Sequence, residues 1–305
     1  MTRWIAFHSL AMLLMLTACE SGSRDSGNVQ AGAGEKGGAA EPAATTGQRD
    51  DAPIAEPADP ADPGTGVGDE AQVVAETLAY GEVGSELVYG HFVFPVEMVD
   101  PLPGLIVIHE WWGLNDDIRA MADRIAAQGY IVLAIDLFGG RTAATPADAR
   151  PMMIEVVENP ELANDNIRQA HEFLARSGQS PRIGVLGWDF GGGWSLNTAI
   201  MLADDLDAAV SYYGQVTDDE ARLAALNVPL LGLFAGNDRG IPADTVRAFE
   251  QALDKLGKTY EIEIYPGAEH SFANPSASQY NAEVAEQAWS RTMDFLARYL
   301  SADAE

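Results

Sequence analysis

Apolar runs of strand length recur along the chain from residue 87 onward, and stretches with helical periodicity separate them. The apolar runs are residues 87–94, 104–108, 131–135, 183–186, 208–212, 229–234 and 260–264. The amphipathic stretches are residues 117–128, 164–176, 242–256 and 279–299. Strands that are apolar throughout, in alternation with helices, are typical of a parallel sheet covered on both faces. The pattern predicts a single α/β domain over residues 71–302, with a mostly parallel central sheet and helices on both faces.

The first 19 residues have the pattern of a bacterial lipoprotein signal peptide. A short start with the basic Arg3 precedes an apolar segment, residues 5–16, that is too short to span a bilayer. Small residues then precede Cys19, the only cysteine of the chain. We predict that Cys19 is lipidated and anchors the protein in the lipid bilayer of the bacterial cell envelope, with the domain facing the periplasm or the exterior. An ordinary secretory signal with a chance cysteine is the alternative.

Residues 20–70 differ in composition from the rest of the chain. They are mainly Gly, Ala, Pro, Ser, Asp and Glu, which cannot bury enough apolar surface to offset chain entropy, so we predict a disordered tether. This segment has 11 acidic and 3 basic residues, and the whole 305-residue chain has a net charge of −28. A negative electrostatic field repels the phosphate backbone, so this charge argues against nucleic acid as a partner.

The segment Gly-Trp-Asp-Phe-Gly at residues 187–191 has the spacing of a nucleophile elbow. It follows the apolar run 183–186 and precedes a stretch for which we predict a helix. Glycines two positions before and after the central residue allow a strained strand-to-helix turn that lifts the central side chain above the sheet edge. The central residue of such an elbow is normally Ser or Cys, and here it is Asp189.

Two further residues complete a candidate catalytic set. Asp238 follows the apolar run 229–234, and His270 follows the run 260–264, so both lie where a strand ends. In α/β-hydrolases the elbow residue comes first along the chain, then the acid, then the histidine, and these three residues have that order. Open α/β sheets also bind ligands at the carboxyl ends of their strands. A histidine held by a carboxylate can act as a general base. The sequence therefore predicts that Asp189, Asp238 and His270 meet.

Five segments together resemble the dienelactone hydrolase family of the α/β-hydrolase superfamily. They are His-Glu-Trp-Trp-Gly-Leu-Asn at 109–115, Asp-Leu-Phe-Gly-Gly at 136–140, the elbow with the next glycine at 187–192, the loop around Asp238, and Tyr-Pro-Gly-Ala-Glu-His at 265–270. The similarity spans residues 87–300 and implies an α/β-hydrolase fold. Residues 215–227 are too few for the large cap domain that many relatives insert there, so we expect no large cap.

The resemblance also implies roles for individual residues. The family uses a triad of Cys, Asp and His, a Glu beside the nucleophile, and backbone N–H groups as an oxyanion hole. The resemblance implies Asp238 as the acid, His270 as the base and Glu110 as the neighbouring Glu. It implies the backbone N–H groups of Trp111 and Phe190 as the oxyanion-hole donors.

The same resemblance bears on substrate binding. The family's archetype holds the carboxylate of its substrate with arginines, and here Arg141 is the candidate for the earlier of them, whereas Asn274 stands near the later one. Trp112 is a candidate for the pocket wall. We expect a small-molecule substrate, and no metal ion or cofactor.

An aspartate at the elbow leaves three functions open. Attack of Asp189 on an ester carbonyl would give a mixed anhydride, so the family's ester or lactone hydrolysis would use water activated by His270. Attack on an sp³ carbon bearing a halide, or on an epoxide, would give an aspartyl ester that water can cleave. The third possible function is that of a binding protein that has lost the nucleophile. We favour a hydrolase of small ester- or lactone-like substrates in the cell envelope that uses Asp189, Asp238 and His270.

Overall fold

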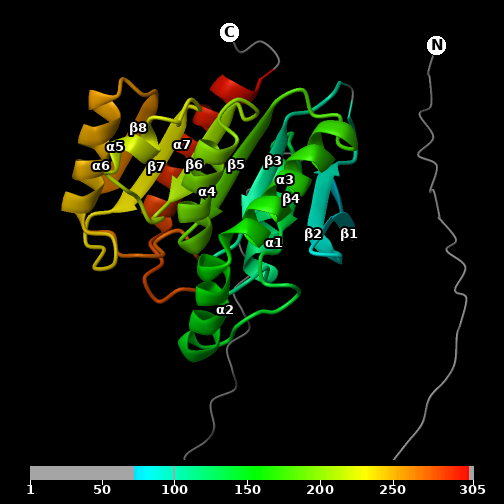
Figure 1. Cartoon of the computed structure of the whole chain (residues 1–305), viewed down its shortest axis with the longest axis horizontal. Helices are drawn as coiled ribbons and strands as arrows, with labels where there is room; N and C mark the ends of the chain where they lie inside the picture. The colour runs from blue at the N-terminus through cyan, green and yellow to red at the C-terminus, as the bar shows by residue number, and fades with distance from the viewer. Residues whose placement is uncertain (1–71, 99, 302–305) are drawn as a thin grey trace, which may run out of the picture. The chain divides into compact units, whose positions relative to one another are not determined.

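The computed structural model describes residues 72–98 and 100–301, which contain one eight-stranded sheet with helices packed on it (Figure 1). The strands are β1 (Val73–Val83), β2 (Glu86–Pro95), β3 (Gly104–Ile108), β4 (Ile131–Ile135), β5 (Ile183–Trp188), β6 (Ala208–Tyr212), β7 (Leu230–Ala235) and β8 (Tyr260–Tyr265). The helices are α1 (Asp116–Ala126), α2 (Pro146–Glu158), α3 (Pro160–Arg176), α4 (Phe190–Met201), α5 (Glu220–Leu223), α6 (Ala243–Lys255) and α7 (Ala282–Leu300). The predicted signal peptide with Cys19 and the predicted tether lie outside the described residues.

The sheet is parallel except at one edge. Its order is β1-β2-β4-β3-β5-β6-β7-β8, in which β4, β3, β5, β6, β7 and β8 pair in parallel. Strand β2 pairs antiparallel with both β1 and β4. This arrangement confirms the prediction of a mostly parallel sheet with an α/β-hydrolase fold.

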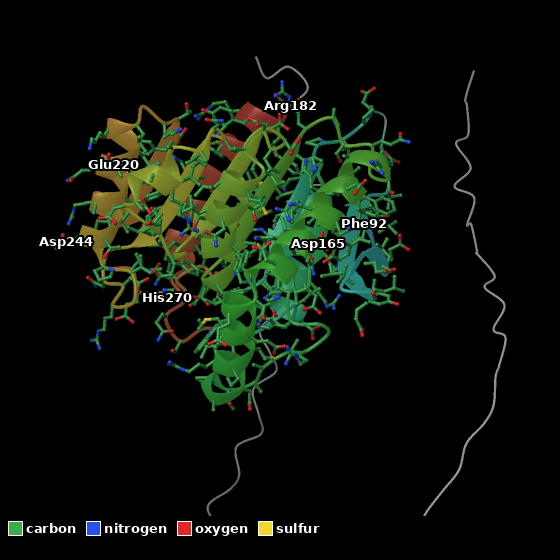
Figure 2. All side chains as sticks on the ribbon, in the orientation of Figure 1. Phe92, Asp165, Arg182, Glu220, Asp244 and His270 are labelled. Carbon is green, nitrogen blue, oxygen red and sulfur yellow. The ribbon has the colours of Figure 1, made fainter. Side chains whose placement is uncertain are left out.

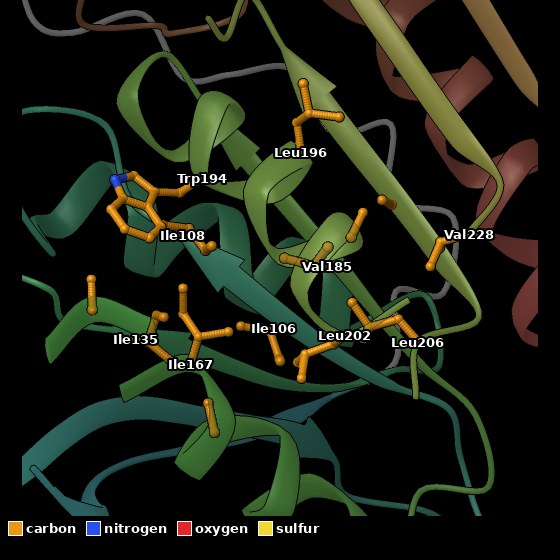
Figure 3. Packing of buried hydrophobic residues seen from close by; sticks show 14 of the residues in the cluster. Ile106, Ile108, Ile135, Ile167, Val185, Trp194, Leu196, Leu202, Leu206 and Val228 are labelled. Atoms are coloured by element: carbon orange, nitrogen blue, oxygen red, sulfur yellow. The ribbon is translucent and has the colours of Figure 1, made fainter. Parts of the chain in front are cut away.

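The two faces of the sheet bury two separate cores, because side chains alternate along each strand. Ile106 and Ile108 of β3 face the core that is shared with α2, α3, α4 and α6, and Figure 3 shows them gathered with Ile167 of α3. Leu105 and Val107 face the core that is shared with α1 and α7. Figure 1 accordingly shows α4 in front of the strands and α7 behind them. Within the described residues, no helix is long and apolar enough to cross a membrane.

The connections at the carboxyl edge of the sheet carry the candidate residues. The chain leaves β3 at residue 109, β5 at Asp189, β6 at Tyr213, β7 shortly before Asp238 and β8 shortly before His270. Because neighbouring parallel strands end at the same edge, these segments lie close together. The β6–β7 connection contains only the four-residue helix α5, in agreement with the expectation of no large cap.

Candidate active site

The elbow residue Asp189 lies between β5 and α4 in a strained conformation. Its φ is 53° and its ψ is −115°, in a region that side-chain-bearing residues rarely occupy. A Cβ atom on Gly191 would lie 2.2 Å from the carbonyl oxygen of Ile108, and one on Gly187 would lie 2.3 Å from the carbonyl oxygen of Gly191. The two glycines are therefore required by close backbone approach, and they allow the turn that exposes the Asp189 side chain to the cleft.

The three predicted catalytic side chains meet in one hydrogen-bonded chain. His270 Nδ1 lies 2.7 Å from Asp238 Oδ2, and His270 Nε2 lies 3.0 Å from Asp189 Oδ1. The other oxygen of Asp238 accepts hydrogen bonds from the backbone N–H groups of Gly240 (2.8 Å) and Ile241 (3.0 Å). The imidazole is thus held between two carboxylates, and the buried Asp238 is itself fixed by its loop. Figure 2 shows where His270 lies relative to the strands.

The two carboxylates keep the imidazole charged. Burial opposes protonation, but the hydrogen bonds and negative charges of Asp189 and Asp238 outweigh it and raise the pKa of His270 to about 10. Burial also opposes ionisation of Asp238, yet its hydrogen bonds with His270 and the loop backbone hold the pKa of this carboxyl below its usual value. At neutral pH the resting site therefore contains an imidazolium ion.

The Asp189 carboxylate also contacts a predicted oxyanion-hole donor. Its Oδ2 accepts a hydrogen bond from the backbone N–H of Trp111 at 3.3 Å. Phe190, the second predicted donor, is the first residue of α4, and first-turn N–H groups have no acceptor within their own helix. His109 fixes the loop that carries Trp111: its Nδ1 lies 2.6 Å from the carbonyl oxygen of Glu110, and its Nε2 accepts the N–H of Leu137 at 3.1 Å.

Glu110 lies behind the catalytic residues and does not line the main cleft. It is 3% exposed, and its carboxyl accepts hydrogen bonds from Asn274 Nδ2 (2.5 Å) and from the Tyr213 hydroxyl (3.4 Å). Burial and, secondarily, the negative charge of Asp189 raise the pKa of Glu110 to about 7. Asp189 thus lies near enough for its negative charge to favour the protonated form of the Glu110 carboxyl.

We expect Glu110→Gln to change the pH dependence of stability. The pKa of Glu110 in the folded state lies above the ordinary value of 4.5, so folding favours its protonated form. Its contribution to stability is complete below pH 4.5 and is lost as the pH rises through about 7. Relative to the native protein, the variant should gain roughly 3 kcal/mol of unfolding free energy between pH 4.5 and pH 8. Urea unfolding at a series of pH values measures this difference.

The matched control is Glu76→Gln, at an exposed position on β1. Its stability should follow the native protein at every pH. If the two glutamine variants show the same pH profile, Glu110 does not hold a proton near neutrality.

A cleft of about 1310 Å³ opens over the catalytic residues. Asp189, Asp238 and His270 line it, together with the predicted residues Trp111, Trp112, Phe190 and Asn274. Asn274 therefore borders the cleft while its amide group holds Glu110.

The structure does not bring Arg141 to this cleft. Its Nε donates to the carbonyl oxygen of Phe138 and its Nη2 to Glu155, both at 2.8 Å. The arginines that line the cleft are Arg150, Arg222 and Arg239. In the part of the chain that the structure describes, no group of His, Cys, Asp and Glu side chains is arranged to hold a metal ion.

Tyr213 is a site residue that sequence reasoning missed. It is fully buried with a φ of 37°, its hydroxyl donates to Glu110, and its ring lies 5.1 Å from the His270 ring, centroid to centroid. Its position directly after β6, at the carboxyl edge of the sheet, was the one available signal. His109, which belongs to the segment 109–115 that resembles the family, is a second residue with a structural role here that the resemblance did not assign.

Comparison with known proteins agrees with this geometry. Residues 90–300 match the model of the dienelactone hydrolase family. The chain is 33% identical over 208 residues to the Usf protein of Aquifex pyrophilus, an alignment that covers 65% of this chain and 89% of the relative. It is 30% identical over 236 residues to a candidate carboxymethylenebutenolidase of Saccharolobus solfataricus, covering 65% of this chain and 90% of the relative.

Solved structures show the same architecture. A candidate dienelactone hydrolase from Klebsiella pneumoniae superposes with a TM-score of 0.68 at 27% identity, covering 75% of this chain and all of that one. A dienelactone hydrolase-like promiscuous phosphotriesterase from metagenomic libraries superposes with a TM-score of 0.69 at 20% identity, covering 75% of this chain and 99% of that one, which shows the shared fold. With the elbow, the acid and the histidine in the positions described, this chain belongs to the dienelactone hydrolase family and is a hydrolase.

Proposed function

We propose that the protein hydrolyses a small molecule through an aspartyl ester on Asp189, acting on an sp³ carbon that carries a halide or belongs to an epoxide. The observation that supports this most is the placement of the two Asp189 oxygens. Oδ2 accepts the N–H of Trp111, a predicted oxyanion-hole donor, whereas Oδ1 lies beside His270 Nε2, and the residue lines the cleft. One oxygen thus accepts the hydrogen bond that an oxyanion would need, which leaves Oδ1 as the candidate nucleophile.

In the first step, Asp189 Oδ1 forms a bond to the substrate carbon, and the carbon–halogen or carbon–oxygen bond breaks. The electron pair leaves with the halide or the epoxide oxygen. The imidazolium proton on His270 Nε2 goes to the alkoxide when an epoxide opens, and to solvent when a halide departs. Displacement of a halide needs no proton, whereas opening of an epoxide uses the charged His270 of the resting site.

The second step needs a neutral His270, and the first step provides it. Once Asp189 is esterified, it no longer carries the negative charge that helped to raise the pKa of His270. The neutral imidazole can then take a proton from water as the water oxygen attacks Cγ of Asp189. Oδ2 becomes the oxyanion, held by the N–H groups of Trp111 and Phe190. When the intermediate collapses, the bond from Cγ to the former Asp189 Oδ1 breaks and the alkoxide leaves with that oxygen. The alkoxide takes the proton of the newly added hydroxyl, which gives the alcohol and the Asp189 carboxylate and leaves His270 protonated as in the resting site.

Hydrolysis of an ester or lactone by water that His270 activates directly is the second candidate, and family membership favours it. Two features of the resting site oppose this route. The Asp189 carboxylate already occupies the Trp111 N–H that a substrate carbonyl would need. A histidine with a pKa of about 10 is also protonated at neutral pH and cannot accept a proton from water.

An isotope experiment separates the two routes. The protein is screened on haloalkanes, epoxides, esters and lactones, and a single turnover of each accepted substrate is then run in H₂¹⁸O with protein in excess. The aspartyl-ester route places ¹⁸O in the Asp189 side chain and leaves the product alcohol unlabelled in that turnover. Peptide mass spectrometry measures the Asp189 label. Label found only in the product, with none in Asp189, would establish direct attack by water and overturn the proposal.

We also propose that the domain acts in the bacterial cell envelope, held by lipid on Cys19. This proposal is supported by the signal-peptide pattern of residues 1–19 and by the scarcity of large apolar residues in residues 20–70. Replacing Cys19 by Ala should move the protein from the membrane fraction to the soluble fraction, and the native protein should carry lipid mass on its mature N-terminus. Unchanged fractionation of the variant, with no lipid on the native N-terminus, contradicts this proposal.

A further inference from the structure

The cleft extends far beyond the catalytic residues, along one face of α4. Phe190, Gly193, Trp194 and Asn197 line it, and their spacing of three and four residues places them on a single helical face. With a rise of 1.5 Å per residue, Asn197 lies roughly 10 Å along the helix from Phe190. The cleft volume of about 1310 Å³ also exceeds the roughly 300–1,000 Å³ of common small-molecule sites. The cleft is therefore long enough for an extended molecule.

A cation that no carboxylate neutralises lies at the far end of this face. Arg222 of α5 lines the cleft, and its Nη2 donates a hydrogen bond to the Asn197 side-chain oxygen. Asn197 is neutral, so it orients the guanidinium group without cancelling its charge. Arg222 has no ion pair with a carboxylate among the described residues, although acidic residues outnumber basic ones 46 to 18 in the chain.

Most of the described arginines that lack a carboxylate partner line the cleft. Within residues 72–98 and 100–301, the arginines without a carboxylate partner are Arg119, Arg150, Arg168, Arg222 and Arg239. Three of these five line the cleft. Its acidic residues surround the catalytic end: Asp117 accepts a hydrogen bond from Ser276, and Glu269 adjoins His270. Of these three arginines, Arg222 is the one whose guanidinium group a neutral side chain orients within the described residues, so it is the candidate that we pursue for an anion.

The wall between the two ends is apolar. The side chains of Phe190 and Trp194 lie on the α4 face, and Val216 of the β6–β7 connection lines the cleft beside them. An extended ligand would thus meet Asp189 at one end, aromatic and aliphatic surface along its body, and Arg222 at the other end.

We propose that the cleft binds an elongated carboxylate with an apolar body, whose anionic end contacts Arg222 while its reacting carbon lies at Asp189. The position of the reacting carbon rests on the proposed function. The recognition of the carboxylate by Arg222 does not depend on it. Because Asn197, which orients Arg222, lies roughly 10 Å along α4 from Phe190, the preferred substrate is a medium-chain molecule that carries its electrophilic carbon well away from its carboxylate.

Calorimetric binding of unreactive probes tests the proposal. Octanoate, butyrate and octanamide are titrated into the native protein, into Arg222→Gln and into Arg168→Gln. Octanoate should bind more tightly than butyrate, because it covers the apolar wall, and more tightly than octanamide, because it carries the charge. Arg222→Gln should weaken octanoate binding about tenfold and leave octanamide unchanged. Arg168 is an equally unpaired, exposed arginine on α3 that does not line the cleft, so its variant should bind like the native protein.

A second variant, at a residue outside α5, is the control for local misfolding of that helix in Arg222→Gln. Asn197→Leu removes the partner that orients Arg222 and should also weaken octanoate binding selectively. Equal binding of octanoate and octanamide, or native octanoate affinity in both variants, would overturn the proposal. The probes carry no leaving group, so their binding does not require an aspartyl ester. A negative ¹⁸O result would therefore refute the proposed chemistry alone, and a negative titration would refute the carboxylate site alone.

Discussion

His270→Gln should stop the reaction at the aspartyl ester, leaving protein whose mass is increased by the alkyl group of the substrate. The variant removes the base that activates water in the second step. With a haloalkane the first step still proceeds, because the halide leaves without a proton from His270. Turnover should fall by about 10³-fold or more, because general-base catalysis of this kind contributes about 10²–10⁴-fold. Intact-protein mass spectrometry detects the adduct, and peptide mapping places it on Asp189.

The control for this experiment is the double variant Asp189→Asn, His270→Gln. It keeps the shape of the elbow residue without a nucleophilic carboxylate, so it should form no adduct and show no turnover. Absence of an adduct in His270→Gln, for a haloalkane that the native protein turns over, would mean that the carboxylate is not the nucleophile.

Asp189→Cys should convert the site to one that hydrolyses activated esters, with a rate at least about 10²-fold above that of the native protein. The thiol would occupy the elbow beside His270, which Asp238 holds at 2.7 Å, and an adjacent imidazolium stabilises the reactive thiolate. With the carboxylate removed, the N–H of Trp111 would be free for the substrate carbonyl oxygen. Release of a chromophoric alcohol from an ester panel measures the gain.

Two variants test whether that gain arises from the triad. Asp189→Asn fills the same position without a thiol and should show no gain on esters. Adding His270→Ala to Asp189→Cys should erase the gain, because the base would be gone. If Asp189→Cys has native circular dichroism and melting temperature but remains inert on the whole panel, the triad is not productively placed for acyl transfer.

The sequence by itself determined the strands that are buried on both faces. The predicted ranges 104–108, 131–135 and 208–212 coincide with β3, β4 and β6, because a strand covered on both sides is a continuous apolar run. Strand β1 was missed because it is an exposed edge strand whose residues are mostly polar or small. Helix α2 was missed because it contains Pro151 and lacks a clear apolar stripe.

The sequence likewise determined the order of the catalytic candidates and the edge at which they meet. Residues that follow parallel strands must emerge at one edge of the sheet, so Asp189, Asp238 and His270 could be grouped from their positions after predicted strands alone. The glycines at 187 and 191 also identified the strained turn, since only a residue without a side chain fits against the backbone there.

Only the tertiary structure decided which way side chains point and what surrounds them. Glu110 turns into a buried setting with Tyr213 and Asn274, away from the cleft, whereas Arg141 turns outward to Glu155. Arg222 reaches Asn197 from a different connection of the sheet and so comes to line the α4 face. Contacts of this kind join residues 14 to 164 positions apart. Periodicity along the chain reports which face of an element is buried, but the partner across a contact, and the pKa that it shifts, depend on how separate elements pack in space.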